Sequence, residues 1–161
     1  MPARKPNYWL FKSEPDVFSY DDLVAAPGKK TLWDGVRNYQ ARNFMRDDMK
    51  KGDRLLYYHS RTTPPGVAGV AEIVRDGYPD PTQFDAKDSH YDAKSNPDDP
   101  RWYCVDIRAK AKAKTYVTIS DLKANAALKD MAVTQKGQRL SVQPVTEAEW
   151  FEVCSMLGLK S

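Results

Sequence analysis

Alternating apolar and polar positions predict a set of short strands along the chain. The strand-like runs are rich in aromatic and β-branched residues and are bounded by Pro, Gly and Asp. They cover residues 8–12, 53–60, 67–75, 102–108, 116–119 and 139–143, and Pro144 ends the last of them. Gly69 falls inside the third run, where a glycine often marks a bulge or a close approach of backbone. The pattern therefore predicts five or six strands.

Helical spacing and capping residues predict helices between these strands. Ser19 is the expected N-cap of a short helix over 19–26, with Asp22 as a weak capping-box partner, and Ser120 caps a stretch reaching about residue 131. Asn38 caps a central helix whose apolar side chains recur at helical spacing, and Gly52 closes that helix. The apolar side chains are Ala41, Phe44, Met45 and Met49.

The C-terminal helix has a clear signal at both ends. Residues 146–149, TEAE, form a capping box, and Gly158 supplies the expected C-terminal stop. The apolar stripe of this helix consists of Trp150, Phe151, Val153, Cys154 and Leu157. The prediction is a helix that packs one face on the core.

Strands and helices do not alternate one for one, which favours an α+β fold over a doubly wound parallel sheet. A small curved sheet or β-barrel decorated by helices fits the irregular strand spacing. With 161 residues, the chain is long enough for a single domain spanning residues 1–161.

Charge and composition restrict the possible function classes only weakly. The formal net charge is +3, and an acidic middle at residues 61–100 lies between basic ends. This distribution leaves room for a cationic face, but it does not by itself establish nucleic-acid binding. Segment 76–100 is rich in Pro and Asp, and loops of that length are usually functional covers or partly disordered.

Cysteine usage and hydropathy predict a cytoplasmic protein without a cofactor or a membrane partner. Cys104 and Cys154 lie among apolar residues without a CxxC partner, so we expect reduced, buried thiols. Two histidines and two scattered cysteines argue against structural zinc. No apolar run approaches the ~20 residues of a membrane helix, and the N-terminus has no sustained apolar segment of a secretory signal.

Segment 31–49 is the most informative part of the chain. Residues 33–36, WDGV, are expected to form a turn, because Asp-Gly supplies the positive φ that tight turns need. Trp33 would then lie on a loop that leads directly into a helix N-terminus. A flat apolar face beside free backbone N–H donors suits a flat, polar ligand such as a nucleobase. The alternative is that Trp33 is simply a core aromatic beneath a loop.

Few other residues carry a chemical signal. The chain contains neither a nucleotide-phosphate motif nor a GxSxG elbow. Lys12 and Ser13 end the first strand and could line a polar pocket. Glu72 lies in an apolar strand, where it is either paired or on the solvent face. His59, at a strand end, is better placed for function than His90 in the acidic loop.

Ser141 and Gln143 alternate with Leu140 and Val142, so they are expected to share one face of the last strand. An amide such as Gln143 donates and accepts at once, which reading a base edge requires.

Five segments together are similar to the EVE domain family. They are KSEPDVFSYDDL, WDGVRNYQARNFMRDDMKKGDRLLYYHS, PGVAGVAEIVRDGYPDPTQFD, PRWYCVDI and KGQRLSVQPVTEAEW. The likeness extends from about residue 8 to residue 150. It implies a PUA-like fold, a small β-barrel of five or six strands with peripheral helices. It also implies kinship with YTH domains, which hold a methylated adenine in an aromatic cage.

The resemblance implies a non-enzymatic module that holds a modified base, of the 5-methylcytosine type, in DNA or RNA. The implied base-binding pocket comprises Lys12, Ser13, Trp33, Gly35, Val36, Asn38, His59, Trp102, Ser141 and Gln143. The basic residues expected to hold phosphates are Arg37, Arg42 and Arg139. Such a protein would be cytoplasmic, or nuclear if its source is eukaryotic.

Two other functions are compatible with the sequence. PUA-like relatives of the ASCH type imply a hydrolase of modified nucleosides that uses a pocket lysine and glutamate, for which Lys12 and Glu72 are the candidates. An interaction protein could instead use the acidic segment 76–100 as its contact surface.

Overall fold

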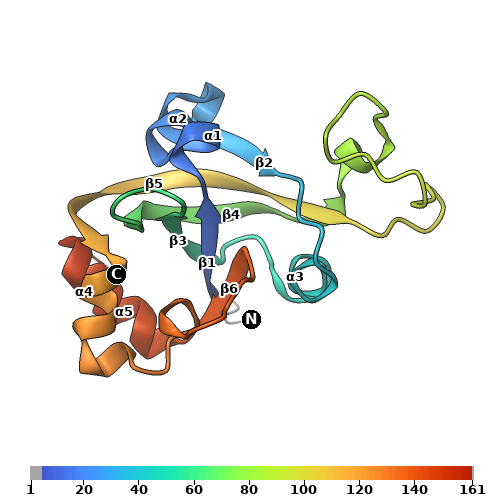
Figure 1. The fold of residues 1–161 in the computed structure, drawn as a ribbon. Coiled ribbons are helices and arrows are strands. Elements are labelled where there is room, and N and C mark those ends of the chain that lie inside the picture. The colour runs from blue at the N-terminus through green and yellow to red at the C-terminus, as the bar shows by residue number, and fades with distance from the viewer. Residues whose placement is uncertain (1–4, 161) are drawn as a thin grey trace.

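A computed structural model describes residues 5–160, which form a mixed, curved sheet with helices around it (Figure 1). The strands are β1 Tyr8–Ser13, β2 Lys30–Trp33, β3 Arg54–His59, β4 Gly66–Pro79, β5 Tyr103–Thr118 and β6 Val142–Val145. Their order is β2-β5-β4-β3-β1-β6, with β1 and β3 parallel and every other pair antiparallel. The expected α+β class and the strand number are confirmed.

The sheet does not close into a complete barrel. The edge strands β2 and β6 each pair with one neighbour, and within residues 5–160 they are not paired with each other. An open seam therefore separates the two edges.

Two strands differ from the sequence prediction because long-range pairing stabilises them. Strand β2 was not expected; it pairs with β5 from Lys30↔Arg108 to Trp33↔Val105. Strand β5 is continuous, whereas two strands over 102–108 and 116–119 were expected. Its middle alternates exposed lysines with half-buried alanines, a composition with weak strand propensity.

The last strand is also shifted from its expected position. It covers Val142–Val145 and contains Pro144, which was expected to end it. Proline is tolerated here because β6 pairs only with β1, so one side of the strand needs no ladder hydrogen bonds. Gly69 lies at a register shift in β4, as expected, and a Cβ there would lie 2.6 Å from the ring of Tyr20.

Five α-helices surround the sheet, and local caps account for where several of them begin. They are α1 Pro15–Phe18, α2 Tyr20–Ala25, α3 Tyr39–Asn43, α4 Ile119–Ala124 and α5 Glu147–Leu157. Ser19 with Asp22, and Thr146 with Glu149, form complete capping boxes, and the Asn38 side chain accepts from the Ala41 N–H. These predictions are confirmed.

Other helix predictions need correction. Thr118, not Ser120, caps α4 through a box with Asp121, and α4 ends at Ala124 instead of reaching residue 131. Two single turns follow it, η4 Ala126–Leu128 and η5 Ala132–Thr134.

The central helix is shorter than predicted. It was expected to continue until Gly52 closed it, but α3 ends at Asn43 and a π-turn, η2 Phe44–Asp48, follows. The remaining single turns are η1 Pro27–Lys29 and η3 Pro81–Phe84. Phe151 of α5 is 44% exposed, unlike the other members of the expected apolar stripe.

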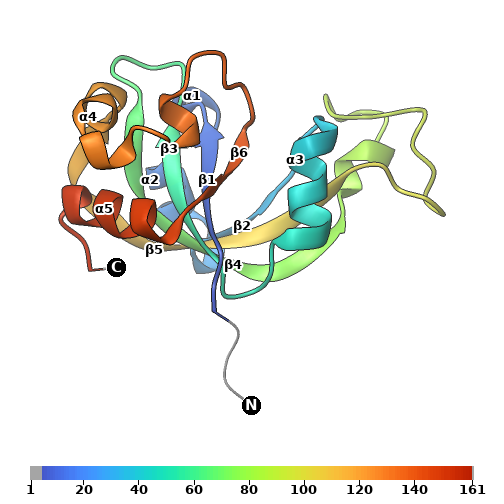
Figure 2. The same cartoon turned by 90° about the horizontal axis from the view of Figure 1, so that it is seen from below.

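Two apolar cores lie on opposite faces of β1, because successive side chains of a strand alternate. Trp9 and Phe11 belong to the core shared with Met45 and Ile73, whereas Leu10 belongs to the core beneath α4 and α5. Figure 2 shows α4 and α5 on one side of β1 and α3 on the other. Cys104 and Cys154 are both buried and free, as expected.

Candidate functional site

A pocket of about 420 Å³ opens at the seam between the two sheet edges. One wall comes from the end of β1, from α1 and from Ser141 just before β6, and the other comes from β2 and the residues that follow it. The lining residues are Lys12, Ser13, Glu14, Val17, Phe18, Thr31, Leu32, Trp33, Asp34, Gly35, Val36, Arg37, His90 and Ser141. The pocket thus brings together six of the ten residues expected from the sequence.

Trp33 lines this pocket and also packs on the core. Its ring centroid lies 5.2 Å from that of Phe11 and 5.5 Å from that of Tyr57, the latter at 89°. The residue is half-buried. Both expectations for Trp33 therefore describe part of its environment, since its ring packs beside core rings and also forms part of the pocket wall.

The turn after Trp33 is held by contacts from a distant segment. Gly35 has a φ of 80°, as the Asp-Gly pattern predicted, and its N–H donates to Asp80 Oδ2 at 2.8 Å. A Cβ on Gly35 would lie 2.6 Å from His90 Nε2, so the imidazole ring packs directly on the glycine. Val36 is buried beside it. His90 therefore lies at the pocket, although the sequence analysis favoured His59 over it.

Arg37 uses all five of its N–H donors inside the protein. Nε and Nη2 donate to the carbonyl of His90 at 3.1 and 2.7 Å, and Nη2 also donates to the Thr82 hydroxyl at 3.1 Å. Nη1 donates to the carbonyl of Val36 at 3.0 Å and to Asp80 at 3.1 Å. No donor is left for a phosphate, so Arg37 acts as a clamp between two loops instead of the expected phosphate contact.

Asp80 is the buried anion of this clamp. Burial opposes its ionisation, but hydrogen bonds from the Thr82 hydroxyl, the N–H groups of Gly35 and Thr82, and Arg37 outweigh it and hold the pKa of Asp80 below its ordinary value. Its segment is fixed in turn by the buried amide of Gln83, which bonds to Asp80, Ser95 and Trp102. The acidic segment is thus ordered, and it supports one wall of the pocket.

The opposite wall carries the polar end of β1. The Lys12 N–H donates to the Ser141 carbonyl at 2.8 Å, which extends the β1–β6 pairing and brings Ser141 to the pocket. Burial lowers the pKa of Lys12, whose Nζ lies 3.5 Å from the Gln138 carbonyl. The Ser13 hydroxyl donates to the carbonyl of Phe18 at 2.7 Å, which ties α1 to the strand.

Four residues expected in the pocket do not line it, and each has another structural partner. Asn38 caps α3. His59 Nε2 accepts from the Tyr20 N–H at 3.0 Å. Trp102 stacks on Tyr39 at 4.9 Å and donates from its indole to Asp92. Gln143 is buried opposite Leu10, which faces the second core, and donates to the Leu140 carbonyl.

The other two expected phosphate contacts lie away from the pocket lining. The Arg42 guanidinium lies 5.0 Å from the Tyr39 ring centroid and donates to the Arg101 carbonyl. Arg139 is exposed, two residues before Ser141.

Glu72 is not brought to Lys12. Its carboxylate pairs with Arg108 at 2.5 Å and with Lys110 at 3.7 Å on the neighbouring strand, and it does not line the pocket. The paired-carboxylate interpretation of Glu72 is therefore the correct one, and its partners are structural.

Sequence reasoning missed several lining residues. Asp34 had a signal, since it lies between Trp33 and Gly35 in the segment already singled out. Val17, Phe18 and Leu32 look like ordinary apolar residues in sequence. His90 had no local signal, because contacts of the ordered acidic segment bring it to the pocket.

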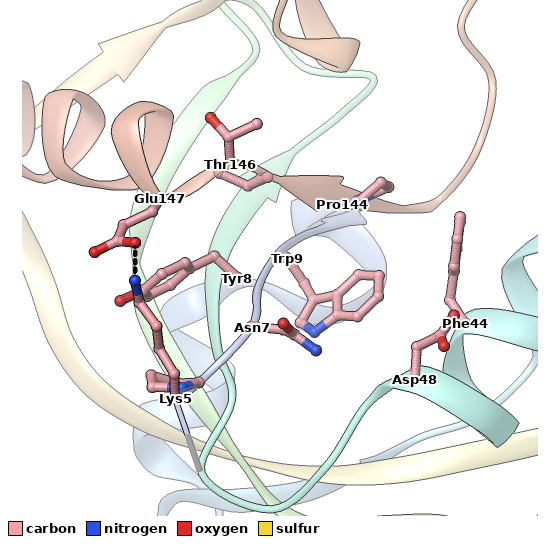
Figure 3. A pocket seen from close by; sticks show the side chains of 11 residues that line it. Lys5, Asn7, Tyr8, Trp9, Phe44, Asp48, Pro144, Thr146 and Glu147 are labelled. Atoms are coloured by element: carbon pink, nitrogen blue, oxygen red, sulfur yellow. Dashed lines mark ion pairs between the residues drawn. The ribbon is translucent and has the colours of Figure 1, made fainter.

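A second pocket, of about 530 Å³, lies near the start of β1 (Figure 3). Lys5 and Glu147 form an ion pair at one end, and Phe44 and Asp48 lie at the other. Trp9 forms part of its wall, but its indole N–H is committed to Asp53 at 3.1 Å. None of the candidates from the sequence lines this pocket, and we take the seam pocket as the candidate site.

Two other kinds of functional feature are absent from residues 5–160. No helix in this part of the chain is both long and apolar enough to cross a membrane. The same residues contain no cluster of three His, Cys, Asp or Glu side chains that could hold a metal ion.

Comparison with known proteins points to one family. The sequence profile of the EVE domain matches residues 7–156. Thymocyte nuclear protein 1 of Danio rerio is 44% identical over 96% of this chain and 74% of its own length.

Among solved structures, a protein from Pseudomonas syringae aligns with a TM-score of 0.87 at 44% identity, covering 93% of this chain and 99% of its own. The human THYN1 protein in complex with DNA containing 5-methylcytosine aligns with a TM-score of 0.88 at 41% identity, covering 96% and 99%.

Proposed function

This chain belongs to the EVE domain family, and on that premise we propose that it binds a modified nucleobase of DNA or RNA, of the 5-methylcytosine type, in the seam pocket. The human relative that was solved with 5-methylcytosine-containing DNA supports this assignment. That protein shares 41% identity with 96% of the present chain.

The half-buried ring of Trp33 on the pocket wall is the observation that carries the proposal. Stacking of one base on an aromatic side chain contributes about 1–3 kcal/mol and tolerates any base. The pocket volume of about 420 Å³ falls within the range of small-molecule sites, roughly 300–1,000 Å³. A base inside a duplex cannot reach such a wall, so the base must be unpaired or flipped out of the stack.

The methyl group of the base has apolar neighbours available. Val17 and Phe18 line the pocket on the α1 wall, and Leu32 and Val36 line it on the wall that carries Trp33. Burial of one methyl contributes about 0.8 kcal/mol, which is only a few-fold in affinity. Larger discrimination must come from polar groups that the wrong base leaves unpaired. Lys12, Ser13 and Ser141 are the groups that we place beside the base edge on the β1 side.

Outside the pocket, Arg42 and Arg139 are the proposed phosphate contacts, and Arg37 is not. Phosphate contacts make affinity salt-dependent, with a change of about one unit in the logarithmic salt slope per contact. Arg139 is exposed and Arg42 is partly exposed, and the Arg42 guanidinium also donates to Asn43 and to the Arg101 carbonyl.

We propose binding without turnover. The hydrolase alternative needs Lys12 beside a glutamate, and the glutamate expected from the sequence is held by Arg108 and Lys110. Two other carboxylates line the pocket: Glu14 pairs with Arg61 at 3.2 Å, and we assign Asp34 a hydrogen-bonding role.

The test measures fluorescence anisotropy of a labelled single-stranded oligonucleotide with one 5-methylcytosine, against the same oligonucleotide with cytosine. The wild type should favour the methylated probe, and Trp33→Ala should weaken binding by about five- to 150-fold, which corresponds to about 1–3 kcal/mol of stacking. Modified nucleosides incubated with the protein should be recovered unchanged by chromatography. The proposal would be contradicted if the wild type bound both probes equally, or if Trp33→Ala bound them as tightly as the wild type. Product formation from a nucleoside would also contradict it.

A further inference from the structure

Asp34 is a pocket carboxyl that lacks an external partner. It lies between Trp33 and Gly35, lines the seam pocket and is half-buried. The carboxyl accepts a hydrogen bond from its own backbone amide, and no other residue within 5–160 donates to it. A carboxyl that lines a pocket in this way has hydrogen-bonding capacity available to a ligand.

The nearby cations do not neutralise Asp34. Arg37 spends its donors on Asp80, Thr82 and two carbonyl groups. The recorded contact of Lys12 Nζ is with the Gln138 carbonyl on the opposite wall. The positive charge of Arg37 is therefore paired with Asp80, and Asp34 remains close to the carboxylate of Asp80.

The surroundings favour the neutral form of Asp34. Burial and the negative charge of Asp80 raise the pKa of Asp34, with a smaller contribution from Asp88, whereas His90 opposes this shift. The charged or titratable groups that face this part of the pocket are Lys12 and Glu14 from the β1–α1 side, Arg37 from its own loop, and Asp80, Asp88 and His90 from the acidic segment.

A neutral carboxyl carries a donor and an acceptor side by side. The cytosine edge carries the complementary pair, an amino group at N4 that donates and a ring nitrogen at N3 that accepts. An ionised carboxylate can accept from N4, but its second oxygen then faces the N3 lone pair. The protonated form removes this repulsion and adds a second hydrogen bond.

We propose that Asp34 reads the hydrogen-bonding edge of a cytosine-type base and holds a proton while the base is bound. The proposal rests on the function proposed above and deepens it by naming the group that recognises the base. At a pH above the pKa of Asp34 in the free protein, Asp34 takes up the proton from solvent when the base binds and returns it when the base leaves. Binding is therefore coupled to proton uptake.

The experiment compares Asp34→Asn and Asp34→Ala with the wild type across pH. The asparagine amide has the same donor and acceptor pair as a protonated carboxyl but does not titrate. The probe is a single-stranded oligonucleotide with one 5-methylcytosine, followed by anisotropy. Asp48→Asn, a matched change of an exposed carboxylate in the second pocket, is the control.

Wild-type affinity should fall by up to about tenfold per pH unit above the pKa of Asp34, as one linked proton requires. Asp34→Asn should bind at the low-pH wild-type level with this pH dependence removed. Asp34→Ala should bind about ten- to a hundredfold more weakly at low pH, because the base edge loses its partner. Asp48→Asn should follow the wild type.

Failure of the two proposals is distinguishable. If the wild type binds the probe and Asp34→Asn retains the wild-type pH profile, the role of Asp34 is wrong and the pocket assignment stands. Equal losses in Asp34→Asn and Asp34→Ala also overturn it, because the amide then fails to replace the acid. Absence of any wild-type binding overturns both proposals. Thermal unfolding of each variant confirms that the protein tested is folded.

Discussion

Gly35 and His90 touch across two segments that are far apart in the sequence: a Cβ on Gly35 would lie 2.6 Å from His90 Nε2. The same glycine donates its N–H to Asp80 and has a φ of 80°. The loop that carries Trp33 and Asp34 is thus pressed onto the acidic segment with no room for a side chain. This contact fixes one wall of the pocket.

Gly35→Ala should destabilise the protein by more than the strain of its backbone conformation alone. A side chain at positive φ costs about 1–2 kcal/mol, and the clash with His90 adds to it. Gly137→Ala is the matched control, because Gly137 has the same φ of 80° but no atom within 4 Å of its Cβ position. Denaturant unfolding measures both losses.

If the two glycine variants lose equal stability, the contact with His90 has no energetic weight. Adding His90→Ala to Gly35→Ala should recover part of the difference, because it removes the clashing ring.

Arg37→Lys should lower stability without changing the salt dependence of nucleic-acid binding. Lysine cannot reproduce five donors in a planar fork, and groups left unpaired near the buried Asp80 cost about 1–3 kcal/mol. Arg139→Ala should show the reverse, a lower salt slope by about one unit with little loss of stability. A lower salt slope in Arg37→Lys would restore Arg37 as a phosphate contact.

Trp33→Phe and Trp33→Ala should separate the two roles of this ring. Phenylalanine keeps much of the contact with Phe11 and Tyr57, so stability should change little and binding should weaken partially. The alanine variant should lose both binding affinity and stability. Its loss of stability should be smaller than the about 3–5 kcal/mol expected for a fully buried aromatic, because the ring is only half-buried.

Trp102→Phe is the control for Trp33, since Trp102 stacks on Tyr39 outside the pocket and should leave affinity unchanged. Calorimetry and anisotropy supply the two readouts. Loss of affinity in Trp102→Phe would place this tryptophan in the binding wall instead.

Asp80→Asn should destabilise the protein in a pH-dependent manner. The folded pKa of Asp80 lies below its ordinary value of 3.8, so its ionised form contributes stability above that pH. This contribution is lost as pH falls from about 3.8 through the folded pKa. The difference between wild type and Asp80→Asn should therefore be constant near neutral pH and shrink in acid. A difference that grows on acidification would reverse the sign assigned to Asp80.

Local signals predicted the elements that local interactions stabilise. The caps at Ser19, Asn38 and Thr146 are formed by side chains within three residues of their partners, so sequence spacing alone locates them. The middle of β5 alternates Ala and Lys, which have weak strand propensity, so it depends on pairing with a distant strand. Strand β2 has only four residues, too few for an alternating pattern to stand out, and it forms by pairing with β5. Those elements were missed or divided.

The same distinction applies to the candidate site. Lys12, Ser13, Trp33 and Gly35 were identified because motif and turn chemistry lie in contiguous segments. His90 reaches the pocket only through the hydrogen bonds of Gln83 and Arg37, which no spacing rule encodes. A surface arginine and a clamp arginine also look identical in sequence, so the commitment of Arg37 to Asp80 could be read only from the structure.

The open seam between β2 and β6 gives the fold a mechanical property that a closed barrel lacks. Within residues 5–160 no ladder hydrogen bond joins its two edges, so they are held together by side-chain contacts such as that between Trp33 and Phe11. A molecule bound between Lys12 and Trp33 contacts both sides of the seam and links them reversibly. Ligand affinity and resistance to unfolding should therefore rise together.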